Sequence, residues 1–396
     1  MYDFETLIDR RGTGAAKWSE LGPYELEQGI LPLSVADMEF RVPPCVEEAC
    51  VAAARHGIYG YTMADEPYQE AVLDWMQGRH GLQAKGEDIL IVRGVVPALG
   101  VAIRALTKPG EGVIIQPPVY PPFFSTVEQN GRRVEACPLR TGEQGYEMDF
   151  EALERAARKE DVSLMLLCSP HNPVGRVWTR EELTRLDGIC RGNDVVIVAD
   201  EIHGDLVPKG RHICFATLSQ EAARNCILCT APSKTFNIPG LQTSNIFILN
   251  PEIRERVARQ ARLDGCCGLS WFGRAATIAA YREGEAWLEA CLRVVASNYG
   301  ILRTYLGRLP GVKLYPMEGT YLAWADFRAL GMEEKELESF LRERAHMFTD
   351  EGYSFGQEGS GFERFNLALP EKALRRQLDM LLAAWEIHCE PTVKKD

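Results

Sequence analysis

The chain has 396 residues, of which 46% are apolar and 25% charged, and its formal net charge is -12. This length exceeds what one hydrophobic core usually serves, so we expect a large domain and a smaller one rather than a single small module or a disordered chain. The excess of acidic residues would repel a nucleic-acid backbone or an anionic lipid surface, so neither is an expected partner.

The N-terminal segment MYDFETLIDRRG has no apolar run after a basic start, and no run anywhere reaches the length that spans a bilayer. Twelve cysteines are scattered through the chain without the framework of a small secreted scaffold. Both observations favour a cytoplasmic protein. Cys226 and Cys229 form a CxxC pair, but in a strand-like run their side chains would point to opposite faces, so no metal site is expected there.

Short apolar runs recur between residues 88 and 249, with helical stretches between them. In chain order the runs are DILIV, EGVII, SLMLLC, DVVIVAD, NCILC and SNIFIL. Near-continuous apolar strands are typical of a mainly parallel sheet covered by helices on both faces. We therefore predict a large α/β domain over residues 48–287, with its ligand beyond the carboxyl ends of the strands.

The rest of the chain predicts a second, smaller α+β unit. The segment EAWLEACLRVVASNYGILRTYL has apolar residues at helical spacing, and a further helix is expected near ALRRQLDMLLAAWEI. Between them lie the strand-like segments GTYLAWADF and FERFNLAL. We assign residues 1–47 and 288–396 to this small domain.

Two loops after the early runs carry candidate ligand contacts. RGVVPAL opens a helical stretch, and amides around Gly94 and Val95 could cradle a phosphate there, although a plain strand-to-helix turn has the same pattern. Tyr120 in QPPVYPPF could offer its ring to a heteroaromatic ligand or pack in the core.

Three further residues follow the later strands. Asn172 in SPHNPVG could donate its amide to a ligand oxygen or satisfy its own turn. Asp200 ends DVVIVAD, where a carboxylate can keep a pyridine nitrogen protonated or be an ordinary polar strand terminus. Lys234 in APSKTFNIPG, taken alone, is more often a surface lysine, so its interpretation depends on the other two.

Arg364 in FERFNLAL lies at or before the start of a strand-like segment. Its planar guanidinium could bind an α-carboxylate at two points, and the alternative is an exposed surface arginine.

Several segments, taken in order, resemble those of fold-type-I pyridoxal 5′-phosphate (PLP) enzymes, and among them the MalY/PatB-type cystathionine β-lyases and cysteine C–S lyases. They are VADMEF, YGYT, GVVPAL, PPVYPPF, SPHNPVG, ADEIHGD, APSKTFNIPGLQTSN, EGTYLAW and FERFNLAL. The resemblance spans nearly the whole chain. It implies the PLP-dependent transferase fold, with a mainly parallel seven-stranded sheet in the large domain.

By that resemblance, Lys234 holds the cofactor as a Schiff base and removes the Cα proton, Asp200 pairs with the pyridine nitrogen, and Tyr120 stacks on the ring. These three are the implied catalytic residues, and no metal is expected. The further implied cofactor contacts are Asn172, His203, Gly94, Val95, Ser233 and Tyr61. Tyr61 would come from a neighbouring subunit, which implies a homodimer, and Arg364 would anchor the carboxylate of an amino-acid substrate.

One position departs from the wider aminotransferase pattern. Many members have an arginine eight residues after the lysine, where this chain has Gln242, and the lyase subgroup also lacks that arginine. The implied reaction is α,β-elimination from L-cystathionine, L-cysteine or a related thioether to a thiol, pyruvate and ammonia. Transamination is the alternative activity, and a regulatory or binding protein on the same fold is the alternative of another class.

Overall fold

The computed structural model describes residues 2–142 and 145–389, and the chain divides into two compact units. The larger unit consists of Val42–Ala290 and Glu318–Thr320. The smaller unit consists of Met1–Arg41, Cys291–Met317 and Tyr321–Asp396. Within the two described ranges, no helix is long and apolar enough to cross a membrane.

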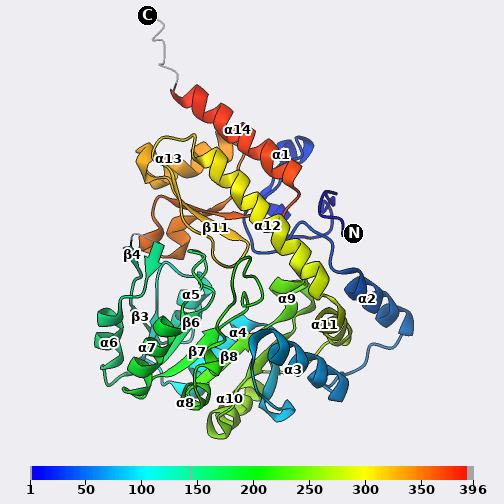
Figure 1. Ribbon diagram of the computed structural model, residues 1–396, viewed down its shortest axis with the longest axis vertical. Coiled ribbons are helices and arrows are strands. Elements are labelled where there is room, and N and C mark those ends of the chain that lie inside the picture. Colours follow the sequence, from blue (N-terminus) through cyan, green and yellow to red (C-terminus); the bar gives the residue numbers. More distant parts are fainter. Residues whose placement is uncertain (1, 143–144, 390–396) are drawn as a thin grey trace, which may run out of the picture. The chain divides into compact units, whose positions relative to one another are not determined.

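The larger unit is built on a seven-stranded sheet of order β1-β9-β8-β7-β6-β2-β3 (Figure 1). Its strands are β1 (Ile89–Val92), β2 (Gly112–Ile115), β3 (Arg133–Ala136), β6 (Val162–Cys168), β7 (Val196–Asp200), β8 (Cys226–Thr230) and β9 (Ser244–Phe247). The pairings from β8 across to β3 are parallel, whereas β9 runs antiparallel to both β8 and β1. The predicted mainly parallel α/β sheet is therefore confirmed.

Apolar helices cover the two faces of this sheet. On one face, α4 (Val95–Leu106) packs over most of the strands and against α10 (Pro251–Leu263), and its residues Leu99 to Ile103 are fully buried. The other face carries α6 (Phe150–Ala157) and α7 (Arg180–Arg191), where Cys190 of α7 contacts Met165 of β6 at 3.8 Å between sulfurs. Burial on both faces explains why the strands are almost continuously apolar.

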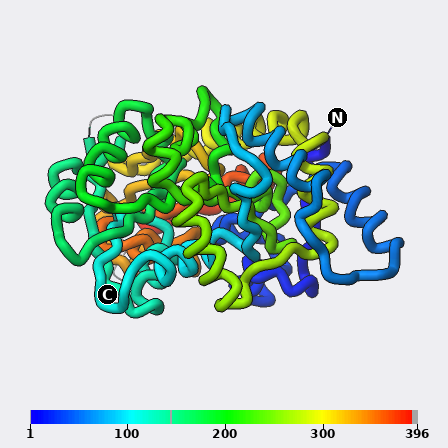
Figure 2. The backbone as a smooth tube through the Cα atoms, turned by 90° about the horizontal axis from the view of Figure 1, so that it is seen from below, coloured from blue at the N-terminus to red at the C-terminus, as the bar shows by residue number. Residues whose placement is uncertain are grey.

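Three helices pack together beside this sheet: α2 (Pro44–His56), α3 (Glu66–His80) and α11 (Trp271–Glu283). The connection between α2 and α3 lies at the periphery of the unit in both Figure 1 and Figure 2. It is strongly exposed, and its large side chains Ile58, Tyr59, Tyr61 and Met63 are 70%, 60%, 112% and 81% accessible. Large apolar groups this exposed are typical of a surface that another molecule covers.

The smaller unit has a four-stranded sheet of order β10-β11-β13-β12. Its strands are β10 (Lys313–Leu314), β11 (Leu322–Asp326), β12 (Asp350–Glu351) and β13 (Phe362–Asn366). Side chains of α12 (Glu285–Leu306) and α14 (Glu371–Cys389) form one apolar core with Ala323 and Phe365 of the sheet. On the other face of the sheet, Trp324 stacks on Phe362 with ring centroids 5.0 Å apart. The predicted long helix EAWLEACLRVVASNYGILRTYL coincides with α12.

Candidate active site

Three predicted site residues follow neighbouring strands of the large sheet. Asp200 ends β7, Asn172 lies four residues beyond β6, and Lys234 lies four residues beyond β8. The backbone N–H of Ser169, just after β6, donates to the Asp200 carbonyl over 3.0 Å. Since β6, β7 and β8 are parallel neighbours, their carboxyl ends bring these residues to one edge of the sheet.

The Asp200 carboxylate is buried, with 4% of the residue exposed. Burial raises the pKa of this carboxyl to about 7, while the N–H of Ile202, which donates to Oδ1 over 3.1 Å, and the charge of Lys234 act in the opposite direction. Lys234 follows the neighbouring strand β8 and so lies at the same edge of the sheet as this carboxylate. A buried carboxylate with so little compensation favours a cationic partner.

Tyr120 and Asn172 are joined through the backbone. The N–H of Tyr120 donates to the carbonyl oxygen of Asn172 over 3.1 Å, and Asn172 is buried with 3% exposure. The backbone N–H of Asn172 also approaches the sulfur of Cys168 at 3.4 Å. Burial raises the pKa of the Cys168 thiol, so this cysteine stays neutral beside Asp200 and is no candidate nucleophile.

Gly94 is the residue before α4, and it has φ 137° and ψ 158°. L-residues with a side chain rarely adopt this conformation, so glycine suits the tight entry into the helix. Val95 begins α4 and is buried. The first backbone N–H groups of this helix have no partner within the helix, which makes its N-terminus suitable for a phosphate.

Lys234 and Ser233 lie on α9 (Pro232–Thr235), a single turn that follows β8. Ser233 is buried, whereas Lys234 is partly accessible. The next residue, Thr235, is fully buried and donates its hydroxyl to the Asp205 carboxylate over 2.7 Å. His203 is buried in the turn between Asp200 and Asp205, and its carbonyl accepts from the N–H of Leu206.

Two predicted residues lie elsewhere in the chain. Tyr61 is fully exposed in the connection between α2 and α3. Arg364 lies in the middle of β13, in the smaller unit, and is 3% exposed, so the alternative reading as a surface arginine is wrong. Its Nε and Nη2 donate to Asp350 Oδ2 at 3.1 and 2.5 Å, and its guanidinium lies 4.7 Å from the Phe355 ring centroid.

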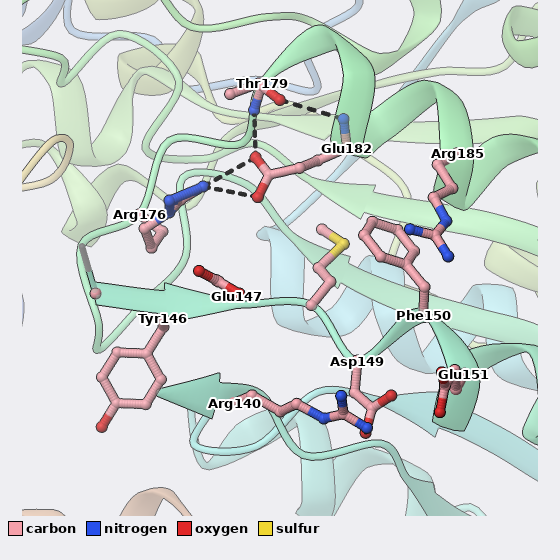
Figure 3. A pocket seen from close by; sticks show the side chains of 12 residues that line it. Arg140, Tyr146, Glu147, Asp149, Phe150, Glu151, Arg176, Thr179, Glu182 and Arg185 are labelled. Carbon is pink, nitrogen blue, oxygen red and sulfur yellow. Dashed lines mark hydrogen bonds and ion pairs between the residues drawn. The ribbon is translucent and has the colours of Figure 1, made fainter. Parts of the chain in front are cut away.

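A separate cavity of about 560 Å³ lies at the N-termini of α6 and α7 (Figure 3). Two pairs of its charged side chains bind each other: Arg176 binds Glu182 at 2.9 Å, and Arg140 binds Asp149 at 2.6 Å. It contains none of the predicted site residues. In the two described ranges, no three His, Cys, Asp or Glu side chains are grouped to hold a metal ion.

Comparison with known proteins shows the family to which the chain belongs. A model described as aminotransferase class I and II matches residues 28–381. The chain belongs to the aminotransferase class I and II family. It is 40% identical to cystathionine β-lyase PatB of Bacillus subtilis, over 94% of this chain and 98% of that protein. The resemblance to MalY/PatB-type enzymes is thus confirmed.

Solved structures of family members agree with the fold. The crystal structure of cystalysin from Treponema denticola, which contains a PLP cofactor, superposes with a TM-score of 0.94 and 40% identity, covering 98% of this chain and all of that one. The PLP-bound C–S lyase from Staphylococcus hominis gives a TM-score of 0.88 and 30% identity, covering 97% of this chain and 98% of that one. The predicted PLP-dependent fold is confirmed.

Two residues linked to the turn that carries Lys234 were not predicted from the sequence. Asp205 and Thr235 are hydrogen bonded to each other, and Thr235 adjoins Lys234. Asp205 lies within the segment ADEIHGD, in which only Asp200 and His203 were predicted to be site residues. The available signal was a second acid five residues beyond Asp200, but the partners of this second acid come from distant segments of the chain.

Proposed function

We propose that this protein is a PLP-dependent C–S β-lyase that eliminates a thiol from L-cystathionine, L-cysteine or a related amino-acid thioether. The observation that carries the proposal is the buried Asp200 carboxylate at the end of β7, with Lys234 following the neighbouring strand β8 at the same edge of the sheet. The names of the two lyase relatives support the same reaction, and both match this chain over nearly its full length.

The residues of the larger unit suit PLP. A pyridinium N–H is the kind of cation that a buried carboxylate such as Asp200 favours, and the N-terminus of α4 behind Gly94 suits the phosphate. Asn172 would bind the ring oxygen, Tyr120 would lie against the ring, and Ser233 and His203 would complete the site. When bound, PLP supplies an electron sink for the bond that breaks at Cα.

The chain's own residues account for the remaining requirements. Lys234 would bind the cofactor covalently and then, once released by the substrate amine, take the proton from Cα. Asp200 holds a negative charge in a buried place and so stabilises a proton on the ring nitrogen. Arg364 would bind the substrate α-carboxylate. Elimination breaks the Cβ–S bond, and the three-carbon product reacts with water to give pyruvate and ammonia.

We further propose a cytoplasmic homodimer in which residues 48–287 form the PLP-binding domain and the remainder forms the small domain. The exposed side chains Ile58, Tyr59, Tyr61 and Met63 support a second copy as the molecule that covers this surface. Tyr61 would then reach the phosphate of the neighbouring subunit. Sedimentation of Met63→Asp, expected to shift toward the monomer, tests the assembly, and an unchanged dimer would remove this surface from it.

The reaction is tested by incubating the purified holoprotein with L-cystathionine in the absence of any keto acid. We expect pyruvate, measured with lactate dehydrogenase, and free thiol in equal amounts. Transamination would instead require a keto acid and release no thiol. The control is Lys234→Ala, which should lose both products and the visible absorbance of the bound cofactor. Pyruvate without thiol, or no product until a keto acid is added, would overturn the lyase.

A further inference from the structure

The buried Asp205 carboxylate is an acceptor for groups from two separate helices. From α3, Trp75 Nε1 and His80 Nε2 approach Oδ1 at 3.1 and 2.7 Å, and Arg79 Nε forms an ion pair with Oδ1 at 3.3 Å. From α9, Thr235 Oγ1 donates to Oδ2 over 2.7 Å. Charge-assisted hydrogen bonds in a buried place are strong and directional, so Asp205 joins α9 to α3.

The helix that carries Lys234 depends on such contacts. α9 spans Pro232–Thr235, and one turn of helix is too short to be stable by itself. Thr235 is fully buried, and the following residue, Phe236, packs edge-on against Trp75 with ring centroids 5.6 Å apart. The residues directly after Lys234 are therefore the ones that tie this turn to α3.

We propose that Asp205 is the positioning residue for Lys234: through Thr235 it fixes α9 so that the lysine amine stays beside Asp200. The inference rests on the proposed function, since it assigns Lys234 the role of the cofactor-binding lysine. Asp205 acts through Thr235 and is not itself a catalytic residue.

The surroundings of Asp205 keep it ionised, as four donors require. Burial raises the pKa of this carboxyl, but the hydrogen bond and charge of His80 and the charge of Arg79 outweigh it, and the pKa is lowered. The network borders a polar cavity of about 310 Å³, and its charged or titratable lining side chains are Arg79, His80, Asp205, Arg211, His212, Glu285 and Glu289. His212 in turn pairs with the buried Glu201 at 2.6 Å.

Asp205→Ala would leave Arg79 and His80 without their buried anion. The variant could then fail to fold, and a loss of cofactor binding would not identify a positioning role. Thr235 is the sharper place to test. Thr235→Val keeps the shape and removes the hydroxyl, while Thr235→Ser keeps the hydroxyl. Thr277→Val is the matched control, because Thr277 is also fully buried and donates to the Gly273 carbonyl over 2.7 Å.

Two measurements distinguish positioning from general stability. In the holoproteins, we expect Thr235→Val to lose PLP on dialysis roughly tenfold faster than wild type. A tenfold change corresponds to the free energy of about one hydrogen bond to a charged group. The pH at which its visible absorbance changes should also shift. In the apoproteins, labelled by ¹³C reductive methylation, the pH titration of the Lys234 resonance should shift in the same variant. Lys234→Arg identifies that resonance.

Thr235→Ser should restore both properties to within about twofold of wild type, and Thr277→Val should leave them unchanged. If Thr235→Val matches Thr277→Val in cofactor loss and in both titrations, the positioning role is overturned. The proposed function fails separately, if the wild-type cofactor spectrum survives in Lys234→Ala. The positioning role is therefore tested by Thr235→Val, and the proposed function by Lys234→Ala.

Discussion

Asp200 and Asp205 are two buried carboxylates in one short segment, and their surroundings differ sharply. In the part of the chain that the structure describes, the Asp200 carboxylate accepts one hydrogen bond, from the N–H of Ile202. Asp205 accepts from Trp75, His80 and Thr235 and pairs with Arg79 as well. Burial acts to raise the pKa of both carboxyls, but the net pKa is raised at Asp200 and lowered at Asp205, where His80, Arg79 and Thr235 outweigh the effect of burial.

The difference separates two uses of a buried acid. A carboxylate that protein donors already satisfy holds secondary structure together, as Asp205 holds α3 to α9. A carboxylate that is buried and sparsely satisfied costs stability in the free protein, and such groups mark places where a ligand completes the site. Substitutions at the two residues should therefore have different and partly opposite effects.

The largest effect is expected at Asp200, in catalysis. Asp200→Asn removes the charge that would keep the cofactor nitrogen protonated, so we expect kcat for L-cystathionine to fall about 1,000-fold, roughly 4 kcal/mol. Pyruvate formation in the holoprotein, at matched cofactor occupancy, measures it. A loss below tenfold would mean that Asp200 is as structural as Asp205.

The same variant should have the opposite effect on the stability of the apoprotein. The pKa of Asp200 rises from 3.8 to about 7 on folding. The stability that the folded apoprotein gains from protonating this carboxyl is therefore complete below about pH 4 and is lost as the pH rises to about 7. Apo Asp200→Asn should therefore melt above apo wild type at pH 8. This difference in melting temperature should narrow toward pH 4, and a difference that stays constant would contradict a raised pKa at Asp200.

Asp205→Asn should lower stability at neutral pH, because it leaves Arg79 and His80 without a buried anion. We expect the free energy of unfolding to fall by about 3 kcal/mol in urea titrations at pH 7. Since the pKa of Asp205 is lowered on folding, the difference should shrink as the pH falls below 3.8. Asp74→Asn, an exposed change on α3, the helix that carries Arg79 and His80, is the control and should have no effect.

Arg364 in the smaller unit extends the comparison to a buried cation. Arg364 is paired with Asp350, much as Asp205 is paired with Arg79, but Arg364 is proposed to bind substrate as well. Arg364→Lys loses the planar fork, and we expect kcat/KM to fall about 100-fold, chiefly through KM. An unchanged KM would show that the ion pair with Asp350 is the whole role of Arg364.

The smallest effect is expected at Glu201, which lies next to Asp200 and is satisfied on both oxygens. Its Oε1 accepts from the N–H of Phe215 at 2.7 Å, and its Oε2 pairs with His212 at 2.6 Å. Glu201→Gln keeps the first contact and weakens the second, so stability should fall by about 1 kcal/mol. A loss of activity comparable with that of Asp200→Asn would break the distinction between the two neighbours.

The sequence predicted the sheet well because its strands are buried on both faces and so are apolar throughout. The edge strand β3 was missed, since its residues RVEA are half exposed and carry charge. Strand ends also predicted which loops carry Asn172, Asp200 and Lys234. The partners of Asp205 could not be predicted, because Trp75 lies 130 residues earlier in the chain and only folding brings the two together.

The antiparallel direction of β9 has a consequence for the reactive lysine. Parallel neighbours need a crossover that passes over a face of the sheet, whereas antiparallel neighbours can be joined directly. The link from β8 to β9, Ala231 to Thr243, is accordingly shorter than every other connection between consecutive strands of this sheet. Lys234 therefore lies in the shortest link of this sheet. An insertion in this link should displace Lys234 more than an insertion in one of the longer links would.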